Sequence, residues 1–308
     1  MSGSGSTPVA FGKEAEFNGA LVNDADPDYY LSGRNTTIEE IELPRALERL
    51  SDPDVVEAIE SIAGRIEGAF QANWAVAADV HEHVRDIVFN DGGTGFTHGQ
   101  AATSKWFIGV DHLSGTVERA LGGVTPTDYS LSYNDDQNTI TASLTAIYAS
   151  ESKSASITPA NIIGPETDST VPFHGFSLDV DGATVKTLQS ATLSISNIAQ
   201  FITGPESEAL DAVIAEPTTD LQFNAIIDGP DHIELAYGGG GQSVDDIQDS
   251  VGAVPGTITL SQAGADVATY DLPRIEPDTY SWSDLVSSNP TTEDINAHVN
   301  GGLTVSAP

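Results

Sequence analysis

The sequence predicts a mainly β fold with a few short helices, and one hairpin gives the strongest reason. Residues 171–180 (VPFHGFSLDV) are followed by Asp181-Gly182, a dipeptide that favours a tight β-turn. In the return segment, residues 185–196, the apolar residues Ala191, Leu193 and Ile195 alternate with serine and threonine. A period of two places one set on a packed face and the other toward solvent. Similar alternation recurs along the chain, so strands are expected to dominate.

The first half is predicted to contain strands with two helices among them. One helix begins at Ser51-Asp52-Pro53-Asp54, because a capping side chain, a proline and acidic residues suit a helix N-terminus. It would bury Val55, Ile59 and Ile62. The second helix covers residues 77–90 and buries Val80, Val84, Ile87 and Val88. The predicted strands are 65–76, 104–110, 116–121, 128–133 and 139–149, with a strand or extended arm over 29–43.

The second half is predicted to hold a short helix and two further hairpins. Gly204-Pro205 opens a run in which Leu210, Val213 and Ile214 share a helical face, with acidic residues near its start. The expected hairpins pair residues 220–227 with 232–237 and residues 256–261 with 266–272, and residues 243–251 form a further candidate helix.

Both halves show alternating strands, a short acidic helix and then hairpins. This shared order predicts a duplicated β domain, although the letters themselves do not repeat. We therefore expect two tandem β-barrel or sandwich domains, each with a flanking helix. The predicted boundaries are an N-terminal arm over 1–10, a first domain over 11–150, a Ser-rich linker over 151–160, a second domain over 161–275 and an irregular C-terminal arm over 276–308.

The charge balance is strongly acidic. The chain has 46 Asp and Glu against 11 Lys and Arg, which gives a formal net charge of −35. Because 39% of the residues are hydrophobic, a folded protein from a salt-rich cytoplasm is favoured over a disordered one. At molar salt the Debye length is about 3 Å, so the self-repulsion is screened. The charge argues against binding of nucleic acid, which needs clustered basic residues.

Other sequence features exclude several classes of protein. The absence of cysteine excludes a disulfide scaffold and a thiol nucleophile. Residues 1–8 lack an apolar core, so a flexible arm is expected there in place of a signal peptide. No window approaches 18 consecutive apolar residues, so no membrane span is expected.

Several short segments resemble tail tube proteins of tailed viruses. They are Phe11-Gly12-Lys13-Glu14, the strand over 68–76 that leads into a helix, and Val171-Pro172-Phe173 followed by Leu193, Ile195 and Asn197 in a Leu-x-Ile-x-Asn pattern. The resemblance covers most of the chain at the level of element order. The tetraglycine at 238–241 and the loop near His98 have no counterpart in it.

The resemblance implies a structural virion protein of a haloarchaeal virus, made in the host cytoplasm. Its β domains would close into rings with copies of the same chain, and the rings would stack into a hollow tube that also meets other tail proteins. Three chains would give a pseudo-sixfold ring if each carries two domains, and six if each carries one. DNA would pass through the acidic bore without specific binding. The candidate assembly and core positions are Phe11, Phe70, Trp74, Phe173, Leu193, Ile195 and Asn197, with residues 92–99 as a contact loop.

Motifs that carry chemistry are weak in this sequence. His81-Glu82-His83 lacks the spacing of a zinc protease helix, because residues two apart point in different directions, so a solvated acidic helix face is expected. The turn over 24–28 (DADPD) lacks the glycine and terminal glutamate of a calcium loop. The adjacent acids at 135–136 and 245–246 suit turns, and His174 and His232 are expected within strands. No catalytic residue, cofactor or metal ligand is predicted.

Two other functions stay open. One is a different virion component, such as a baseplate hub or a decoration protein. The other is a halophilic β-sandwich enzyme that acts on polysaccharides, which would need a pair of carboxylates in a cleft with aromatic platforms.

Overall fold

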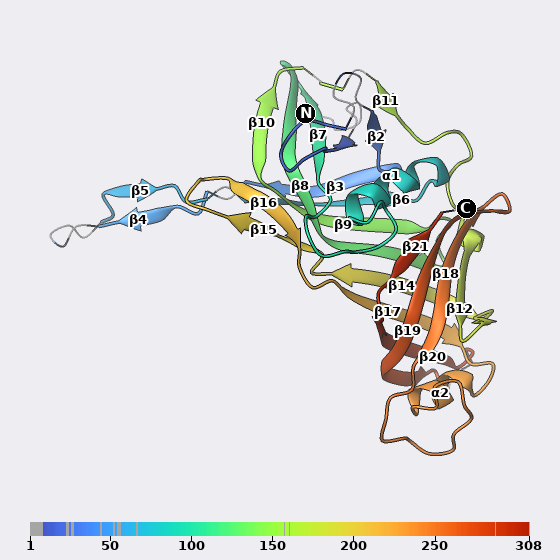
Figure 1. The fold of residues 1–308 in the computed structure, drawn as a ribbon. Coiled ribbons are helices and arrows are strands. Elements are labelled where there is room, and N and C mark those ends of the chain that lie inside the picture. The colour runs from blue at the N-terminus through green and yellow to red at the C-terminus, as the bar shows by residue number, and fades with distance from the viewer. Residues whose placement is uncertain are drawn as a thin grey trace.

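Two groups of strands share one long strand, β8 (Gly115–Asn134), and together they make up most of the fold (Figure 1). The structure is a computed structural model that describes residues 9–22, 25, 28–43, 45–51, 53, 57–65, 67–156, 158–159, 161–286 and 288–307. Over these residues the protein is mainly β, with two α-helices and one 3₁₀ turn. The predicted fold class is therefore confirmed.

The first group, which we call the upper sheet, lies at the top of Figure 1. Its order is β11–β2–β1–β7–β8–β10, in which the β11–β2 pair is parallel and the others are antiparallel. Its other strands are β1 (Val9–Lys13), β2 (Tyr29–Leu31), β7 (Ser104–His112), β10 (Ser150–Ser154) and β11 (Ile162–Ile163).

The second group, the long sheet, is antiparallel and has the order β3–β6–β9–β8–β14–β17–β20–β19–β18–β12–β13. A further strand, β21 (Thr304–Ser306), pairs with β19. Figure 1 shows β18, β19 and β20 at the lower right, away from the upper sheet. The strands are β3 (Arg34–Glu42), β6 (Gly68–Ala75), β9 (Thr141–Tyr148), β12 (Phe176–Val180), β13 (Ala183–Thr184), β14 (Leu188–Ser196), β17 (Thr218–Ile226), β18 (Val254–Gln262), β19 (Ala265–Ser283) and β20 (Thr292–Asn300).

The strand β8 changes partners near its middle. Its pairing with β7 ends at Val124, and its pairing with β9 begins at Thr125. Gly123 stands at this change with a φ of +60°, a conformation that glycine adopts at little cost. A Cβ at this position would lie 3.0 Å from the Cβ of Ala149. The two strands predicted at 116–121 and 128–133 are therefore one strand that serves both sheets.

The core of the long sheet contains a row of paired side chains that crosses both predicted domains. The strands of the first half join those of the second where β8 pairs with β14. The row is at most 3% exposed to solvent, and it runs through Trp74, Ala142, Leu131, Leu193, Leu221 and Ala297. Because one sheet extends across the predicted boundary, the pairing joins the two halves, and the division into tandem domains stays a prediction.

Helix α1 (Ala78–Val88) confirms the helix predicted over 77–90. Its buried face carries the four predicted residues Val80, Val84, Ile87 and Val88, and it also carries His81. The Nε2 atom of His81 lies 2.8 Å from the hydroxyl of Tyr270 on β19. The expectation of a solvated face was therefore wrong for His81, which fills the contact between α1 and the long sheet.

The predicted hairpin at 171–196 is correct at its turn and wrong in its pairing. Asp181 and Gly182 both have positive φ, as a tight hairpin turn requires. The strand that returns after this turn, β13, is only two residues long. The next strand, β14, pairs with β8 and β17. The start of the segment is a 3₁₀ turn, η1 (Phe173–Gly175), so Phe173 lies outside the strand.

Two predicted helices are strands in the structure. The run after Gly204 forms β16 (Ala209–Ile214), which pairs with β15 (Ala199–Thr203). Its five apolar residues fit a period of either 2 or 3.6, and the cross-strand partner decides between them. The helix predicted from Ser51 is replaced by a hairpin of β4 (Glu48–Leu50) and β5 (Glu60–Ile62). Val55 lies outside the described residues.

The opposite error occurs after β17. Residues 232–237 were expected as a strand, and the structure has helix α2 (Asp231–Ala236). Pro230 at its N-cap and Asp231 in its first turn are residues that favour a helix start. The helix considered for residues 243–251 is not formed, since these residues are bends and loop.

The expected C-terminal arm is part of the core. Within residues 276–308, β19 continues to Ser283, and β20 lies between β17 and β19. Ile295, Ala297 and Val299 on β20 are buried. Their alternation with polar residues is a strand pattern, and the prediction of an irregular arm was wrong because it gave that pattern too little weight.

The expected linker begins with a strand. Residues 150–154 form β10, which pairs with β8. Arg119 on β8 holds Glu151 on β10 through two hydrogen bonds, Nε to Oε1 at 2.6 Å and Nη2 to Oε2 at 2.8 Å. Burial acts to raise the pKa of the Glu151 carboxyl, but hydrogen bonds from Arg119 and Tyr148 outweigh it and lower the pKa below 4.5.

This ion pair predicts a pH dependence of stability. A carboxyl with a lower pKa in the folded state adds stability that is complete above the unfolded pKa and is lost as pH falls through the folded pKa. The free-energy difference of unfolding between wild type and Glu151→Gln is therefore expected to shrink as pH falls below 4.5. Urea unfolding over a pH series measures it, with Glu60→Gln on exposed β5 as the control. A difference that does not change with pH would contradict the assignment.

Candidate functional site

The described residues contain no metal centre. No three His, Asp, Glu or Cys side chains among them are grouped so that they could hold a metal ion. In the acidic turn over 24–28, residues 24, 26 and 27 lie outside the described part of the chain. Asp136 lies in the turn after β8, where its backbone N–H donates to Asn134 Oδ1 at 2.9 Å. Turn chemistry therefore accounts for the acidic pair at 135–136.

The histidines are separate structural contacts. His83 stacks on Tyr30 with a ring-centre distance of 3.6 Å, whereas His81 points into the core. The two imidazoles therefore point apart, as their spacing predicts. His174 lies in η1 and His232 in α2, so the expectation that both lie within strands was wrong.

The seven predicted assembly and core positions occupy three kinds of environment. Five are buried: Phe11, Phe70, Trp74, Leu193 and Ile195 are at most 3% exposed. Phe11 and Phe70 both pack on Trp106, with ring-centre distances of 5.3 and 5.1 Å. Asn197 has a φ of 55°, and its Nδ2 donates to the Glu216 carbonyl at 3.0 Å. Phe173 is 36% exposed and packs edge-on against His174.

These positions divide the candidate site into a core and a surface. The five buried residues belong to the interior of the fold, so they support it and are not free to contact another chain. Asn197 adopts the left-handed conformation that asparagine tolerates well, and it fastens the turn before β15. Of the seven, Phe173 presents the most exposed apolar surface.

The predicted contact loop at 92–99 packs partly within the subunit. The Val305 N–H on β21 donates to the Thr94 carbonyl at 2.7 Å, and Phe96 packs on Phe89 at 4.9 Å. The side chain of Asn90 bonds to Thr97 at both its oxygen and its nitrogen, each at 2.8 Å. A role for this loop between subunits stays a prediction.

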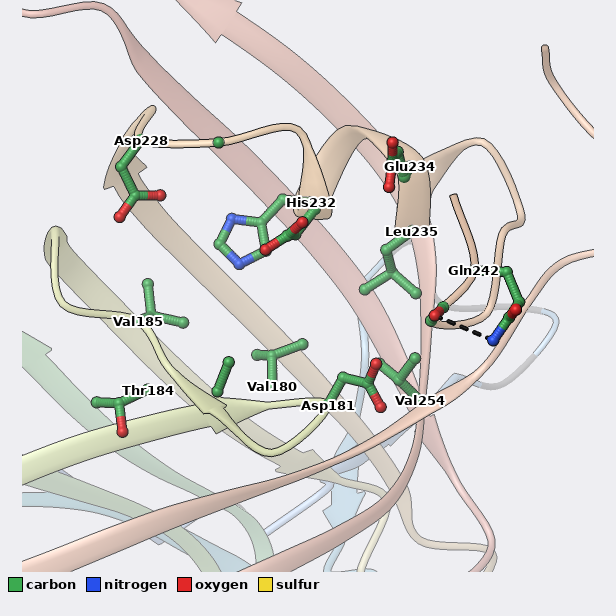
Figure 2. Close-up of a pocket in the computed structure, with 14 residues that line it drawn as sticks. Val180, Asp181, Thr184, Val185, Asp228, His232, Glu234, Leu235, Gln242 and Val254 are labelled. Carbon is green, nitrogen blue, oxygen red and sulfur yellow. Dashed lines mark hydrogen bonds between the residues drawn. The ribbon is translucent and has the colours of Figure 1, made fainter. Parts of the chain in front are cut away.

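An acidic pocket of about 360 Å³ lies between the β12–β13 turn and helix α2 (Figure 2). Figure 2 shows Asp228, His232 and Glu234 on one side and Val180 and Asp181 on the other. His232 fastens α2 to β20, because its Nδ1 lies 2.6 Å from the buried Glu293 Oε1. Among the described residues, the lining contains no Trp, Tyr or Phe. The pocket therefore lacks the aromatic platform that a polysaccharide-acting enzyme would use.

A second hollow lies beside the open edge of β3. This β3 groove has a volume of about 840 Å³ and lies between β3 and the β7–β8 hairpin. Within the described part of the chain, no strand other than β6 pairs with β3, so its other edge is open to a further strand, although the Ile41 carbonyl accepts from Arg119 Nη1 at 3.2 Å and the Glu42 carbonyl from the Tyr148 hydroxyl. The apolar side chains that line the groove are Val9, Leu31, Ile38, Ile41, Ile108, Val110 and Val117.

Two hairpins project from the same side of the molecule, β4–β5 and β15–β16 (Figure 1). We call them the paired hairpins. The base of β4–β5 contacts the turn of β15–β16, because Nη2 of Arg65 donates to the Gly204 carbonyl at 3.0 Å. Although they project into solvent, they carry large apolar side chains with exposures between 44% and 59%: Leu47, Ile59, Ile62, Ile202 and Leu210.

The comparisons with known proteins give no relative. No family model matches the chain, and no curated protein matches it. The function therefore has to be inferred from the geometry. None of the helices in the described part of the chain is long and apolar enough to cross a membrane.

Sequence reasoning missed the paired hairpins and the β3 groove. Ile59 and Ile62 were assigned to the buried face of a helix, which removed them from consideration as surface residues. The sequence contains a signal for their exposure. Glu57 and Glu60 flank Ile59 and Ile62, and acidic neighbours argue against burial of these isoleucines. The groove depends on β3 and β7, which are far apart in the sequence.

Proposed function

We propose that this protein is a structural subunit of the tail tube of a tailed virus from a salt-rich host. Copies of the chain would assemble into rings, and the rings would stack into a tube through which DNA passes. The main support is the pair of projecting hairpins, since five large apolar side chains exposed on two projecting elements are suited to contact with a partner. The role requires no catalytic residue or cofactor.

The open edge of β3 supports pairing between subunits. An exposed strand edge can accept a strand from another chain, and closure into a ring removes such edges. The β3 groove adds apolar surface next to that edge, so an incoming strand would find both backbone and side-chain partners. Three glutamates on β3, at 39, 40 and 42, would oppose uncontrolled pairing in dilute buffer. Salt screens this repulsion.

The charge supports a conduit in preference to a binding channel. With a net charge of −35, the surface repels phosphate, so DNA would slide without sticking. An acidic surface also keeps the free subunit soluble in concentrated salt before it assembles. The same acidic surface would therefore serve both to repel DNA and to keep the free chain soluble.

Negative-stain microscopy of the purified full chain in molar salt tests the proposal. Rods or stacked rings are the expected result, and the symmetry of the end views would distinguish rings of three chains from rings of six. Single rings that do not stack would indicate a different virion component. Monodisperse globules at every salt concentration and protein concentration would overturn the proposal.

A further inference from the structure

A buried arginine on helix α1 forms no ion pair with a carboxylate in the part of the chain that the structure describes. Arg85 is 5% exposed, and its Nε is buried without a hydrogen-bond partner. Among the described residues, the ion pairs to carboxylates involve Arg119, Arg274 and three histidines, and Arg85 is not one of them. In a chain with 46 acidic residues, this absence requires an explanation. A buried charge is costly unless it is compensated.

The polar groups around Arg85 do not supply the missing negative charge. His81 lies one turn earlier on the same helix, and burial, together with the charge of Arg85, lowers its pKa to about 3. His81 is therefore neutral at working pH. Burial raises the pKa of Tyr129 to about 12 and raises that of Tyr270 well above 10.0, so both hydroxyls keep their protons. The charge of Arg85 acts on all three groups. None of these three groups therefore supplies a negative charge to balance that of Arg85.

The same cluster contains unused hydrogen-bond donors. Besides Arg85 Nε, the buried Tyr129 hydroxyl and His81 Nδ1 have no close hydrogen-bond partner within the described residues, although the Tyr129 hydroxyl lies near enough to that of Tyr270 to interact with it. The first two are donors, and His81 Nδ1 donates in the tautomer whose Nε2 accepts the Tyr270 hydroxyl proton at 2.8 Å. Unsatisfied buried groups in one place indicate a bound water or ion. A water molecule would accept these hydrogen bonds but would not neutralise the positive charge of Arg85.

We propose that Arg85, His81 and Tyr129 form a binding site for a small monovalent anion, chloride in a salt-rich solvent. The anion would accept hydrogen bonds from the guanidinium and the hydroxyl and would neutralise the buried charge. Because α1 meets β8 through Tyr129 and β19 through Tyr270, the anion would stabilise the junction between the two halves of the long sheet. At molar salt even a weak site is filled.

Two measurements test the site within one subunit, so their outcome does not depend on whether the chain forms tubes. In crystals of the full chain grown in potassium bromide, anomalous density is expected against the Arg85 guanidinium. In solution, potassium chloride is expected to raise the Tm by roughly 2–5 °C above potassium gluconate at equal potassium concentration, and the rise should saturate. Arg85→Gln should abolish this difference.

The control variant is Arg274→Gln, which removes a positive charge from an exposed site and should keep the full chloride effect. If Arg85→Gln does not fold, Arg85→Lys takes its place and the bromide density of the wild type still decides. The proposal is overturned if the cluster holds only water in bromide crystals, or if wild type and Arg85→Gln respond equally to chloride.

Discussion

Replacement of both Ile59 and Ile62 by aspartate is expected to abolish the proposed assembly and leave the chain folded. Each isoleucine is 53% exposed on the β4–β5 hairpin, so neither contributes much to the core. In an apolar contact between subunits, each buried and unpaired carboxylate would cost several kcal/mol. Each 1.4 kcal/mol corresponds to a tenfold loss in affinity, so two substitutions would lower assembly by several orders of magnitude.

Sedimentation and negative-stain microscopy in molar salt measure this loss, and thermal unfolding checks that the subunit is intact. The double variant Ile59→Val and Ile62→Val is the matched control, because it keeps the apolar surface and the strand propensity. Tubes formed normally by the aspartate variant would show that the paired hairpins are not contact elements.

The second large effect is expected from Leu193→Ala, which should destabilise the folded chain by about 2–5 kcal/mol. Leu193 is 1% exposed and lies between Leu131 on β8 and Leu221 on β17. Its loss leaves a cavity in the row of side chains that joins the two halves of the long sheet. The neighbouring strands cannot collapse into the space without breaking their register.

Urea unfolding followed by tryptophan fluorescence measures this effect. Ser194→Ala is the control, because the next residue on β14 points to the opposite face of the sheet, and such a change is expected to stay within about 0.5 kcal/mol. A Leu193→Ala loss no larger than that of Ser194→Ala would mean that the seam between β8 and β14 is not part of the cooperative core.

The sequence predicts features that depend on neighbouring residues. The Asp181-Gly182 turn is correct because positive φ is a local requirement that Asp-Gly meets. Helix α1 is correct because Val80, Val84, Ile87 and Val88 repeat with the helical period. The fold class follows from the same patterns, since alternation is frequent along the chain.

Features that depend on distant residues were not predictable in the same way. The run at 209–214 is a strand because β15 pairs with it, although its apolar residues also fit a helix. The acidic pocket is lined by Asp181 from the β12–β13 turn and by Glu234 and Gln242 from and after α2, and no local pattern predicts that these segments face each other. The acidic residues are evident in the sequence, but the fact that they line one pocket is not.

The cluster at Arg85 shows the same limit. The spacing of His81 and Arg85 by four residues predicts that they share a helix face. The two tyrosines that complete the cluster come from β8 and β19, at positions 129 and 270, and only the fold brings them to α1.

The position of β20 in the middle of the long sheet has a consequence for biosynthesis. Strands β17 and β19 are separated by β20, which occupies residues 292–300, so the edge of each strand that faces β20 stays unpaired until those residues have left the ribosome. Most strands of the long sheet are therefore translated before β20, but the sheet cannot be completed until β20 has been added. The exposed edges of β17 and β19 are therefore able to pair with other strands during synthesis, and β20 closes both of them at once.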